Sequence, residues 1–412
     1  MQTKLAPAFQ GTREGQAAEE ILRRCVHCGF CTATCPTYQL LGDELDGPRG
    51  RIYLIKQVME GEKPTRATQE HLDRCLTCRN CETTCPSGVQ YGQLLEIGRE
   101  IVDAQVERPQ GERLQRWLLK EGLPSPLFKP AIKLGQLVRP LLPATLKDKV
   151  PSAAQRRAHD WPQREHQRKV GLLLGCVQPA LMPNINSATA RVLDAAGIQT
   201  LVADDAGCCG AIRTHLSDHE GGVNDMRRNI DAWWPLVQTR QIEALVMNAS
   251  GCGVTVKEYG RSLAHDPAYA DKAAKISAMT KDVSELLPGL VSALKPRLKK
   301  TKTGKLAYHP PCTLQHGQQL RGEVEAGMRA LGFELQLATC DSHLCCGSAG
   351  TYSVLQPELS KKLRDQKLQA LAPLHAETIV SGNIGCIQQL QSGTETPVRH
   401  WIEVLDAALG GI

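Results

Sequence analysis

The chain has 412 residues, which is enough for two or three domains with their own hydrophobic cores. Aromatic residues make up only 4 % of it, which argues against a nucleic-acid platform built on base stacking, and 49 basic against 43 acidic residues leave a net charge of +6. No apolar run approaches the ~20 residues that span a bilayer, and the N-terminus has no stretch resembling a secretory signal. With 17 cysteines, these features predict a protein of the reducing cytoplasm that does not bind nucleic acid.

Two cysteine runs of identical spacing dominate the N-terminal quarter. Each reads C-x2-C-x2-C-x3-C-P, the run that holds the paired clusters of bacterial-type ferredoxins. Three cysteines of a run surround one cube, while the fourth lies too far along the chain and reaches the neighbouring cluster. We therefore predict two [4Fe-4S] clusters. The first is expected to be bound by Cys25, Cys28, Cys31 and Cys85, and the second by Cys75, Cys78, Cys81 and Cys35.

Other cysteine chemistry matches these runs poorly. A zinc site needs two C-x2-C pairs or a Cys/His set, and a disulfide framework needs an oxidising compartment. His27, between two predicted ligands, is expected on a helix face or in support of the ligands rather than as a ligand itself.

The residues around the runs predict an α-helical ferredoxin domain over residues 1–106. Pro48 predicts a helix start, because proline fits the first helical turn. The apolar residues expected on the inward face of this helix are Ile52, Ile55 and Met59. A second helix is expected after Pro86, with Leu94, Ile97, Ile101 and Val102 inward.

Residues 107–168 are predicted to form a proline-rich basic arm and linker. Prolines at this density prevent one long helix. Two interpretations of the arm stay open: it wraps over neighbouring domains, or its alternating Leu and Lys/Arg residues form a patch for a membrane surface or a partner. The polar and basic stretch from Ser152 to Arg168 is expected to be the linker into the next domain.

The C-terminal half is an internal duplication of an α/β domain, with copies over residues 169–303 and 304–412. In each copy short apolar strands alternate with helices, which predicts parallel α/β layers. The expected strands begin at Val170, Thr200 and Ala244 in the first copy and at Lys305, Glu334 and Thr378 in the second. Together with the ferredoxin domain, the duplication predicts an α+β multidomain fold.

A second set of cysteines follows the duplication, in loops just after strands, where α/β folds place their sites. Each copy offers four thiols, which can satisfy one [4Fe-4S] cluster. Zinc, disulfide exchange or plain buried cysteine stay open as alternatives. The third site would use Cys176, Cys208, Cys209 and Cys252, and the fourth Cys312, Cys345, Cys346 and Cys386. If the copies pack about a pseudo-twofold axis, the four thiols of each copy should cluster near the interface between the copies.

One cysteine and four histidines remain near these sites. Cys340 is expected to be a small core residue outside both groups of thiols. The histidines are expected to be structural, with support of the metal ligands as the alternative; they are His215, His309, His316 and His343.

The sequence has no G-x-G-x-x-G after a strand and no G-x-x-x-x-G-K-[ST]. We therefore expect neither FAD nor NAD on this chain, and no catalytic residue is assigned to it. One-electron clusters can only pass on electrons that another subunit delivers. The residues alone predict an electron-transfer component with a separate flavoprotein partner.

The segments GDELDGPRGRIY (residues 42–53) and SHLCCGSAGTY (residues 342–352) resemble the iron-sulfur subunits of bacterial glycolate oxidases. The resemblance covers nearly the whole chain. It implies FAD-binding partner subunits that oxidise glycolate and some other 2-hydroxy acids, and relay of the electrons to quinone or another respiratory acceptor. A cytoplasmic protein, either free or peripheral on the cytoplasmic face of the inner membrane, is then expected.

The C-terminal repeats are also similar to the cysteine-rich domain of heterodisulfide reductases, anaerobic glycerol-3-phosphate dehydrogenases and lactate-utilisation proteins. In heterodisulfide reductase this repeat ends in C-x2-C and supports a non-cubane cluster. Here Ala249 and Asn383 occupy the position three residues before Cys252 and Cys386. The missing fifth thiol favours an electron relay, with a heterodisulfide-reductase-like or glycerol-3-phosphate-dehydrogenase-like subunit as the alternative.

Overall fold

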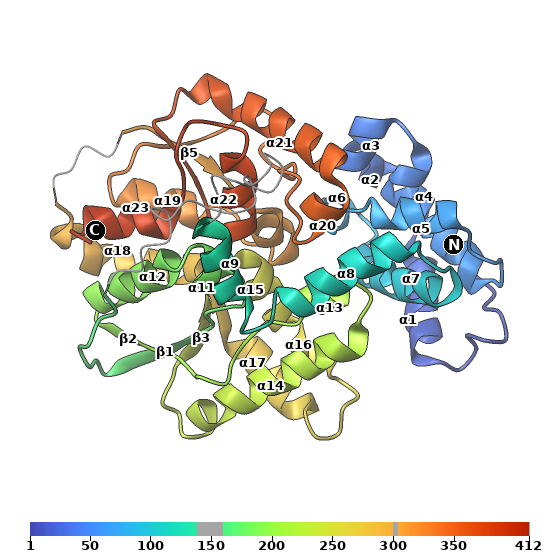
Figure 1. Ribbon diagram of the computed structural model, residues 1–412, viewed down its shortest axis with the longest axis horizontal. Helices are drawn as coiled ribbons and strands as arrows, with labels where there is room; N and C mark the ends of the chain where they lie inside the picture. The colour runs from blue at the N-terminus through green and yellow to red at the C-terminus, as the bar shows by residue number, and fades with distance from the viewer. Residues whose placement is uncertain (138–159, 300–303, 412) are drawn as a thin grey trace.

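The computed structural model describes residues 1–137, 160–299 and 304–411. Figure 1 shows a helical N-terminal module at one end of the molecule and two α/β units beside it, the first repeat in green to yellow and the second in orange to red. The predicted fold class, a ferredoxin module followed by a duplicated α/β domain, is confirmed.

The N-terminal module consists of short helices around the cysteine runs. They are α1 (Arg13–Arg24), α2 (Phe30–Ala33), α3 (Pro36–Leu41), α4 (Pro48–Met59), α5 (Arg66–Asp73), α6 (Asn80–Thr84) and α7 (Tyr91–Gln105). As predicted, α4 begins at Pro48 and buries Ile52, Ile55 and Met59. In α7, Leu94 and Val102 are buried, whereas Ile97 and Ile101 are only partly buried at the edge of the same core.

The arm begins with two helices, α8 (Gln110–Gly122) and α9 (Phe128–Leu137). Helix α8 crosses from the N-terminal module to both repeats: Glu112 pairs with Arg66, Glu121 with Arg213, and Gln115 Nε2 donates to the carbonyl of Val354 at 3.4 Å. Its outer face carries the exposed side chains of Leu114, Trp117 and Leu118. Residues 138–159, which include the first part of the predicted linker, lie outside the described residues.

Each repeat contains a four-stranded parallel sheet. The first has the order β2-β1-β3-β4 and the second the order β6-β5-β7-β8, so the two topologies are identical. The strands of the first sheet are β1 (Arg168–Leu172), β2 (Ile198–Leu201), β3 (Ala244–Met247) and β4 (Thr280–Asp282). Those of the second are β5 (Leu306–His309), β6 (Leu335–Leu337), β7 (Thr378–Ser381) and β8 (Val398–His400).

Helices cover these sheets. In the first repeat they are α11 (Gln178–Leu181), α12 (Asn184–Ala195), α13 (Ala211–His215), α14 (His219–Gln238), α15 (Ser250–Lys257), α16 (Tyr259–Ser262), α17 (Ala270–Met279) and α18 (Val283–Leu294). In the second they are α19 (Glu323–Ala330), α20 (Tyr352–Leu355), α21 (Pro357–Leu371), α22 (Ile384–Gln391) and α23 (Trp401–Ala408), with a π-helical turn at Thr313–Gly317.

The two repeats share one hydrophobic core and exchange helices across it. Helix α23 of the second repeat packs on α12 of the first, and α18 of the first packs on α19 of the second. Polar contacts reinforce the exchange, since Arg191 Nε donates to Asp406 at 2.9 Å and the backbone N–H of Ser250 donates to the carbonyl of Gly382 at 3.3 Å. This reciprocal packing is what a pseudo-twofold arrangement requires.

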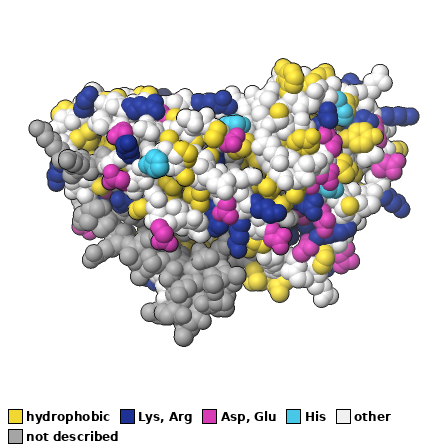
Figure 2. Space-filling model, turned by 90° about the horizontal axis from the view of Figure 1, so that it is seen from above, with side chains coloured by type: hydrophobic (Ala, Val, Ile, Leu, Met, Phe, Trp, Pro, Cys, Tyr) yellow, Lys and Arg dark blue, Asp and Glu magenta, His cyan; other side chains and the backbone are white. Residues whose placement is uncertain are grey.

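Within the described part of the chain, no helix combines the length and apolar character needed to cross a bilayer. On the face shown in Figure 2, basic and acidic side chains are interspersed, so the small net charge does not gather there into a patch of one sign.

Candidate metal centres

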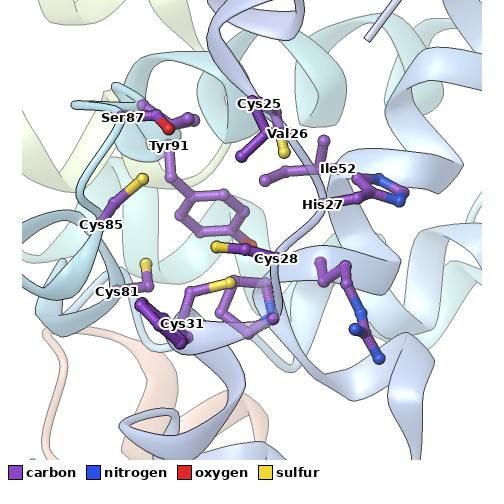
Figure 3. A pocket seen from close by; sticks show the side chains of 15 residues that line it. Cys25, Val26, His27, Cys28, Cys31, Ile52, Cys81, Cys85, Ser87 and Tyr91 are labelled. Carbon is purple, nitrogen blue, oxygen red and sulfur yellow. The ribbon is translucent and has the colours of Figure 1, made fainter.

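The first group of cysteines lines a pocket in the N-terminal module (Figure 3). Cys25 ends α1, Cys31 lies in α2 and Cys85 ends α6, while Cys28 lies in the turn between α1 and α2. The left-handed backbone of His27 (φ 56°) and Gly29 (φ 86°) makes this turn tight. Burial, with Cys25 and Cys85 nearby, raises the pKa of Cys31 to about 11. The structure therefore brings together the four cysteines of the predicted first cluster.

The second group gathers Cys35, Cys75, Cys78 and Cys81. Burial raises the pKa of Cys81 well above its ordinary value, and the nearby thiols of Cys78, Cys75 and Cys35 add to the effect. Cys81 also borders the pocket of the first group, so it lies between the two sites. The grouping is the one that a crossed ligand arrangement needs; the assignment of each cysteine as a ligand stays a prediction.

Hydrogen bonds hold the cysteines of the second group. The backbone N–H of Thr77 donates to Cys75 Sγ at 3.4 Å, and the buried hydroxyl of Tyr91 donates to the same sulfur at 3.5 Å. Cys35 Sγ lies 3.3 Å from Thr37 Oγ1. Donors directed at sulfur stabilise thiolate charge, and they tune the reduction potential of a cluster bound there.

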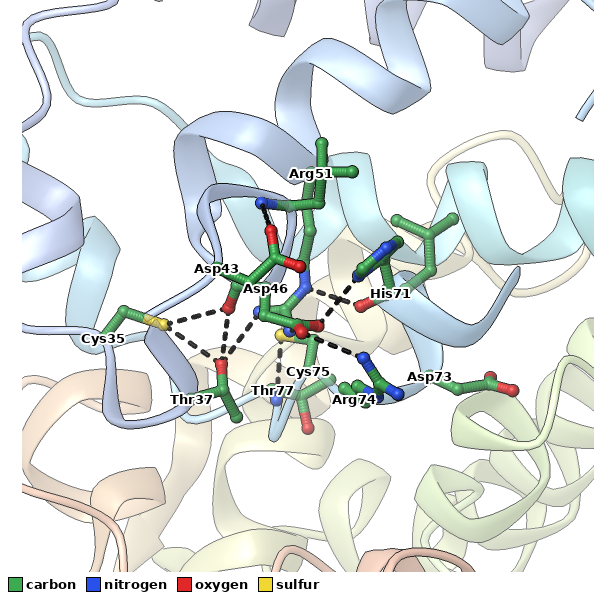
Figure 4. Close-up of polar contacts among 12 residues, drawn as sticks. Cys35, Thr37, Asp43, Asp46, Arg51, His71, Asp73, Arg74, Cys75 and Thr77 are labelled. Atoms are coloured by element: carbon green, nitrogen blue, oxygen red, sulfur yellow. Dashed lines mark hydrogen bonds and ion pairs between the residues drawn. The ribbon is translucent and has the colours of Figure 1, made fainter. Parts of the chain in front are cut away.

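A buried ion-pair network lies next to this second group (Figure 4). Arg51 is fully buried, donates to Thr37 Oγ1 at 3.1 Å and to the carbonyl of His71 at 2.7 Å, and pairs with Asp46. Asp46 also accepts from Arg74 at 3.0 Å. The stretch that contains Asp46 and Arg51 carries the family resemblance, but the sequence alone assigns no role to either residue.

In the first repeat, four thiols form a chain of contacts. The neighbouring thiol of Cys208, together with burial, raises the pKa of Cys176 well above its ordinary value. The thiol of Cys209 contacts those of Cys208 and Cys252. Gly210 follows the pair with φ 93°, and a Cβ atom there would lie 2.7 Å from the carbonyl oxygen of Gly222. Glycine is therefore required for the turn that brings the thiols together.

The second repeat repeats this arrangement. The thiol of Cys345 and burial raise the pKa of Cys312 well above its ordinary value, and Cys346 contacts both Cys345 and Cys386. Gly347 follows the pair with φ 82°. The four predicted thiols thus converge in each copy.

Cys340 lies outside both groups, but it is exposed rather than part of the core, so that expectation was wrong. It follows β6 in an exposed loop. The pattern of the sequence around it, polar on both sides, already disfavoured burial.

The histidines near the sites differ in their surroundings. His316 joins the ferredoxin module to the second repeat: its Nδ1 lies 2.9 Å from Thr83 Oγ1, and its Nε2 lies 2.9 Å from the carbonyl oxygen of His343. Desolvation lowers the pKa of His215, which is only partly buried, to about 4. His309 is buried beside Cys346 and Cys386, and neither of its ring nitrogens has a hydrogen-bond partner.

The donor sets fit iron–sulfur clusters. Buried thiols with raised pKa values stay protonated at neutral pH, and a bound metal can replace those protons. Sets of four convergent thiols match the ligand requirement of a [4Fe-4S] cluster. A buried cysteine with a purely structural role does not need three other thiols beside it.

Comparison with known proteins agrees with these sites. Residues 21–89 match the family model of a 4Fe-4S dicluster domain, and residues 170–257 and 306–391 each match that of a cysteine-rich domain.

Several relatives match the whole chain or a large part of it. The "Glycolate oxidase iron-sulfur subunit" of Escherichia coli K12 is 53 % identical over 412 residues, covering 99 % of both chains. The "Probable glycolate oxidase iron-sulfur subunit" of Bacillus subtilis is 31 % identical over 91 % of this chain and 89 % of its own. "Lactate utilization protein A" of Geobacillus thermodenitrificans is 26 % identical over 58 % of this chain. The chain therefore belongs to the family of glycolate oxidase iron-sulfur subunits.

Proposed function

We propose that this chain is the electron-transferring subunit of a complex that oxidises glycolate. In this proposal, FAD-binding partner subunits take two electrons from glycolate, or from a related 2-hydroxy acid, and this chain passes them on one at a time. The support is the match to glycolate oxidase iron-sulfur subunits over the whole chain, together with a sequence that has no dinucleotide-binding fingerprint.

One observation carries the proposal: Cys78 of the ferredoxin module lies beside Cys312 and Cys345 of the second repeat. Leu76 and Tyr352 enclose these cysteines in one buried cluster. An iron–sulfur cluster, when bound, accepts and releases a single electron. The contact therefore supports a continuous route from the second group of ferredoxin cysteines into the second repeat, with apolar side chains that keep water out.

Polar contacts hold the ferredoxin module against the repeats and tie its two cysteine runs together. Arg79 of the ferredoxin module pairs with Glu258 of the first repeat at 2.5 Å. Asn80 Nδ2 donates to the carbonyl of Thr34 at 2.9 Å, which ties the two cysteine runs together. These contacts hold the groups of cysteines at fixed separations, which electron transfer between bound clusters requires.

We propose two [4Fe-4S] clusters in the ferredoxin module, at the crossed cysteine sets, and further iron–sulfur sites in the repeats. We propose that the electron acceptor is quinone and that this chain reaches it at the cytoplasmic face of the inner membrane. No segment of this chain needs to cross the membrane for that contact. The exposed apolar side chains of α8, Leu114, Trp117 and Leu118, support contact with an apolar surface.

Heterodisulfide chemistry has less support. Asn383 occupies the position of the missing fifth thiol, and its Nδ2 lies 3.7 Å from Cys386 Sγ. An amide at this place can hydrogen-bond a thiolate but cannot form a disulfide or bind a further iron through sulfur. The relay is therefore the simpler role.

The test is anaerobic purification of the native complex, followed by addition of glycolate and a quinone. We expect flavin-bearing partners, no glycolate oxidation by the isolated chain, and quinone reduction by the complex. With Cys78→Ser, glycolate should still bleach the flavin while quinone reduction is lost. Cys340→Ser, at an exposed cysteine outside both groups, is the control and should behave as wild type. Glycolate turnover by the isolated chain, or full quinone reduction in the Cys78→Ser complex, would contradict the proposal.

A further inference from the structure

Among the described residues, two groups bring three metal-binding side chains to within 4.8 Å of one another. In the first, Asp43, Asp46 and His71, the central carboxylate of Asp46 already accepts from Arg51 and Arg74. Two arginines at this carboxylate would repel a cation. The second group is His309, Cys346 and Cys386, all buried.

His309 has no partner that explains its burial. It is the last residue of β5 and is 1 % exposed, and neither ring nitrogen is hydrogen-bonded. Leaving a buried polar group unsatisfied is destabilising, so such groups are almost always paired. A metal ion held by the two adjacent thiolates would supply the missing partner. The separation of the three donor atoms suits groups that share one metal ion.

The first repeat provides an internal comparison. Leu173 lies three residues before Cys176, as His309 lies three residues before Cys312, and Leu173 is buried in an apolar cluster with Cys209. The two copies thus have the same thiols but differ at this position. A histidine is not needed to build the fold around four such thiols, because the first repeat builds it with leucine.

A second difference points the same way. Lys367 of α21 is 3 % exposed, lies near Cys312 and Cys346, and donates to the backbone carbonyls of Asp341 and Ser342. Asn229, fully buried in α14, takes the equivalent place in the first repeat and donates to the carbonyl of Cys208 at 2.7 Å.

The equivalence rests on the glycine after each cysteine pair. A Cβ atom on Gly347 would lie 2.5 Å from the carbonyl oxygen of Ser360, and one on Gly210 would lie 2.7 Å from that of Gly222. Lys367 lies seven residues after Ser360, and Asn229 lies seven residues after Gly222. The second repeat therefore has an imidazole where the first has an aliphatic side chain, and an ammonium group where the first has a neutral amide.

We propose that the second repeat binds iron through a nitrogen of His309 as well as through the thiolates of Cys346 and Cys386, whereas the site of the first repeat has sulfur ligands only. Iron bound by two thiolates and a neutral nitrogen has less negative charge in its ligands than iron bound by four thiolates, which raises its reduction potential, as histidine ligation does in Rieske centres. The buried ammonium of Lys367 favours the added electron further. The second repeat is then the higher-potential site and the electron sink of the chain. This rests on the proposed function only in assuming that the repeat holds iron.

The test uses the full chain, prepared anaerobically with natural-abundance or ¹⁵N-labelled histidine and analysed by pulsed electron paramagnetic resonance. We expect a histidine nitrogen coupling that changes from the ¹⁴N to the ¹⁵N pattern on labelling. His309→Leu, which installs the residue of the first repeat, should remove the coupling and shift the highest-potential signal downward. His309→Cys keeps a metal ligand, so iron content should be retained while the coupling is lost. His316→Gln is the matched control and should keep the coupling.

The outcomes separate this proposal from the relay itself. Iron in the second repeat with no histidine nitrogen coupling, or a coupling that survives His309→Leu, overturns the nitrogen ligand and leaves the relay intact. Zinc in the repeat, or iron and sulfide sufficient only for the ferredoxin module, also overturns it. Loss of iron from the ferredoxin cysteines would instead contradict the proposed function.

Discussion

Arg51 and Asp46 form a buried ion pair, with Arg51 Nη2 3.3 Å from Asp46 Oδ1 and each side chain 1 % exposed. Arg51 lies near Cys75 and Cys35, so its positive charge faces the sulfur atoms of the second group of ferredoxin cysteines. The pair therefore combines two roles: it ties α4 to the loop before it, and it places a cation next to sites that carry negative charge.

Removal of the Arg51 cation should lower both the free energy of unfolding and the reduction potential of the neighbouring cluster. In Arg51→Met, Asp46 stays buried with one guanidinium partner fewer, and breaking a buried pair in this way typically costs about 3–5 kcal/mol. We expect a loss of that order in the free energy of unfolding, measured anaerobically in urea, and a lower potential of one cluster in a redox titration. Arg23→Met, which removes an exposed pair with Glu19, should change stability by less than about 1 kcal/mol. Equal stabilities of the two variants would contradict the role given to Arg51.

The crossed arrangement of cysteines predicts which cluster a single substitution damages. Cys35 belongs to the first run by sequence but groups with Cys75 and Cys81 in space. Cys35→Ser should therefore alter the spectrum of the cluster near Cys78 and leave that near Cys28 unchanged. Cys85→Ser should have the reverse effect. Spectroscopic loss of the sequence-adjacent cluster in either variant would show that the ligands are not crossed.

The glycine after each cysteine pair should be irreplaceable. A Cβ atom on Gly347 would lie 2.5 Å from the carbonyl oxygen of Ser360, in a backbone conformation that side chains rarely adopt. Gly347→Ala should destabilise the protein by about 1–3 kcal/mol and reduce iron content in the second repeat. Gly289→Ala, in α18 with no atom within 4 Å of the new methyl group, is the control and should stabilise by roughly 0.5–1 kcal/mol. Both are measured by chemical unfolding and iron analysis, and an unchanged Gly347→Ala protein would refute the steric argument.

His400 should make the interface between the repeats sensitive to acid. Its Nε2 donates to the carbonyl of Asn248 at 3.0 Å and its Nδ1 accepts from the N–H of Ile402 at 3.1 Å, so the ring is held neutral. Burial lowers the pKa of His400 from 6.5 to about 3. Below pH 6.5, His400 is protonated in the unfolded chain but stays neutral in the folded chain. The free energy of unfolding therefore falls progressively from pH 6.5 down to pH 3.

His400→Gln removes this titration. The free energy of unfolding of the variant should be lower than that of wild type at pH 7, and it should fall less steeply between pH 6.5 and pH 4. Parallel stability curves for the two proteins over that range would show that His400 does not contribute to the acid sensitivity.

The grouping of the cysteines could be predicted from their spacing along the sequence, because metal ligands from one segment recur at short, regular intervals. The strands β1, β3, β5 and β7 followed from apolar runs, because central strands of parallel sheets are buried on both faces. Edge strands β4 and β8 were missed. Each has three residues with a polar or charged residue at its centre, and each leads directly into a helix, so no apolar run marks them.

Other features depend on contacts between distant segments and leave no local pattern. Lys367 reads as one charge among many on α21, although its side chain is almost fully buried. His309 reads as an ordinary residue before two prolines, and only the fold places it beside Cys346 and Cys386. The reciprocal exchange of α18 and α23 likewise requires knowledge of how the two copies pack.

The burial of the paired cysteines has a consequence for how the protein matures. Cys208 and Cys346 are each 1 % exposed, and Cys346 lies in the hydrophobic core that the two repeats share. Iron and sulfide cannot reach Cys346 once the two copies have closed on each other. Delivery must therefore precede closure or use a transient opening of the repeats. A chain that closes too early would stay empty, while a loaded chain would be shielded from chelators and oxidants by the same packing.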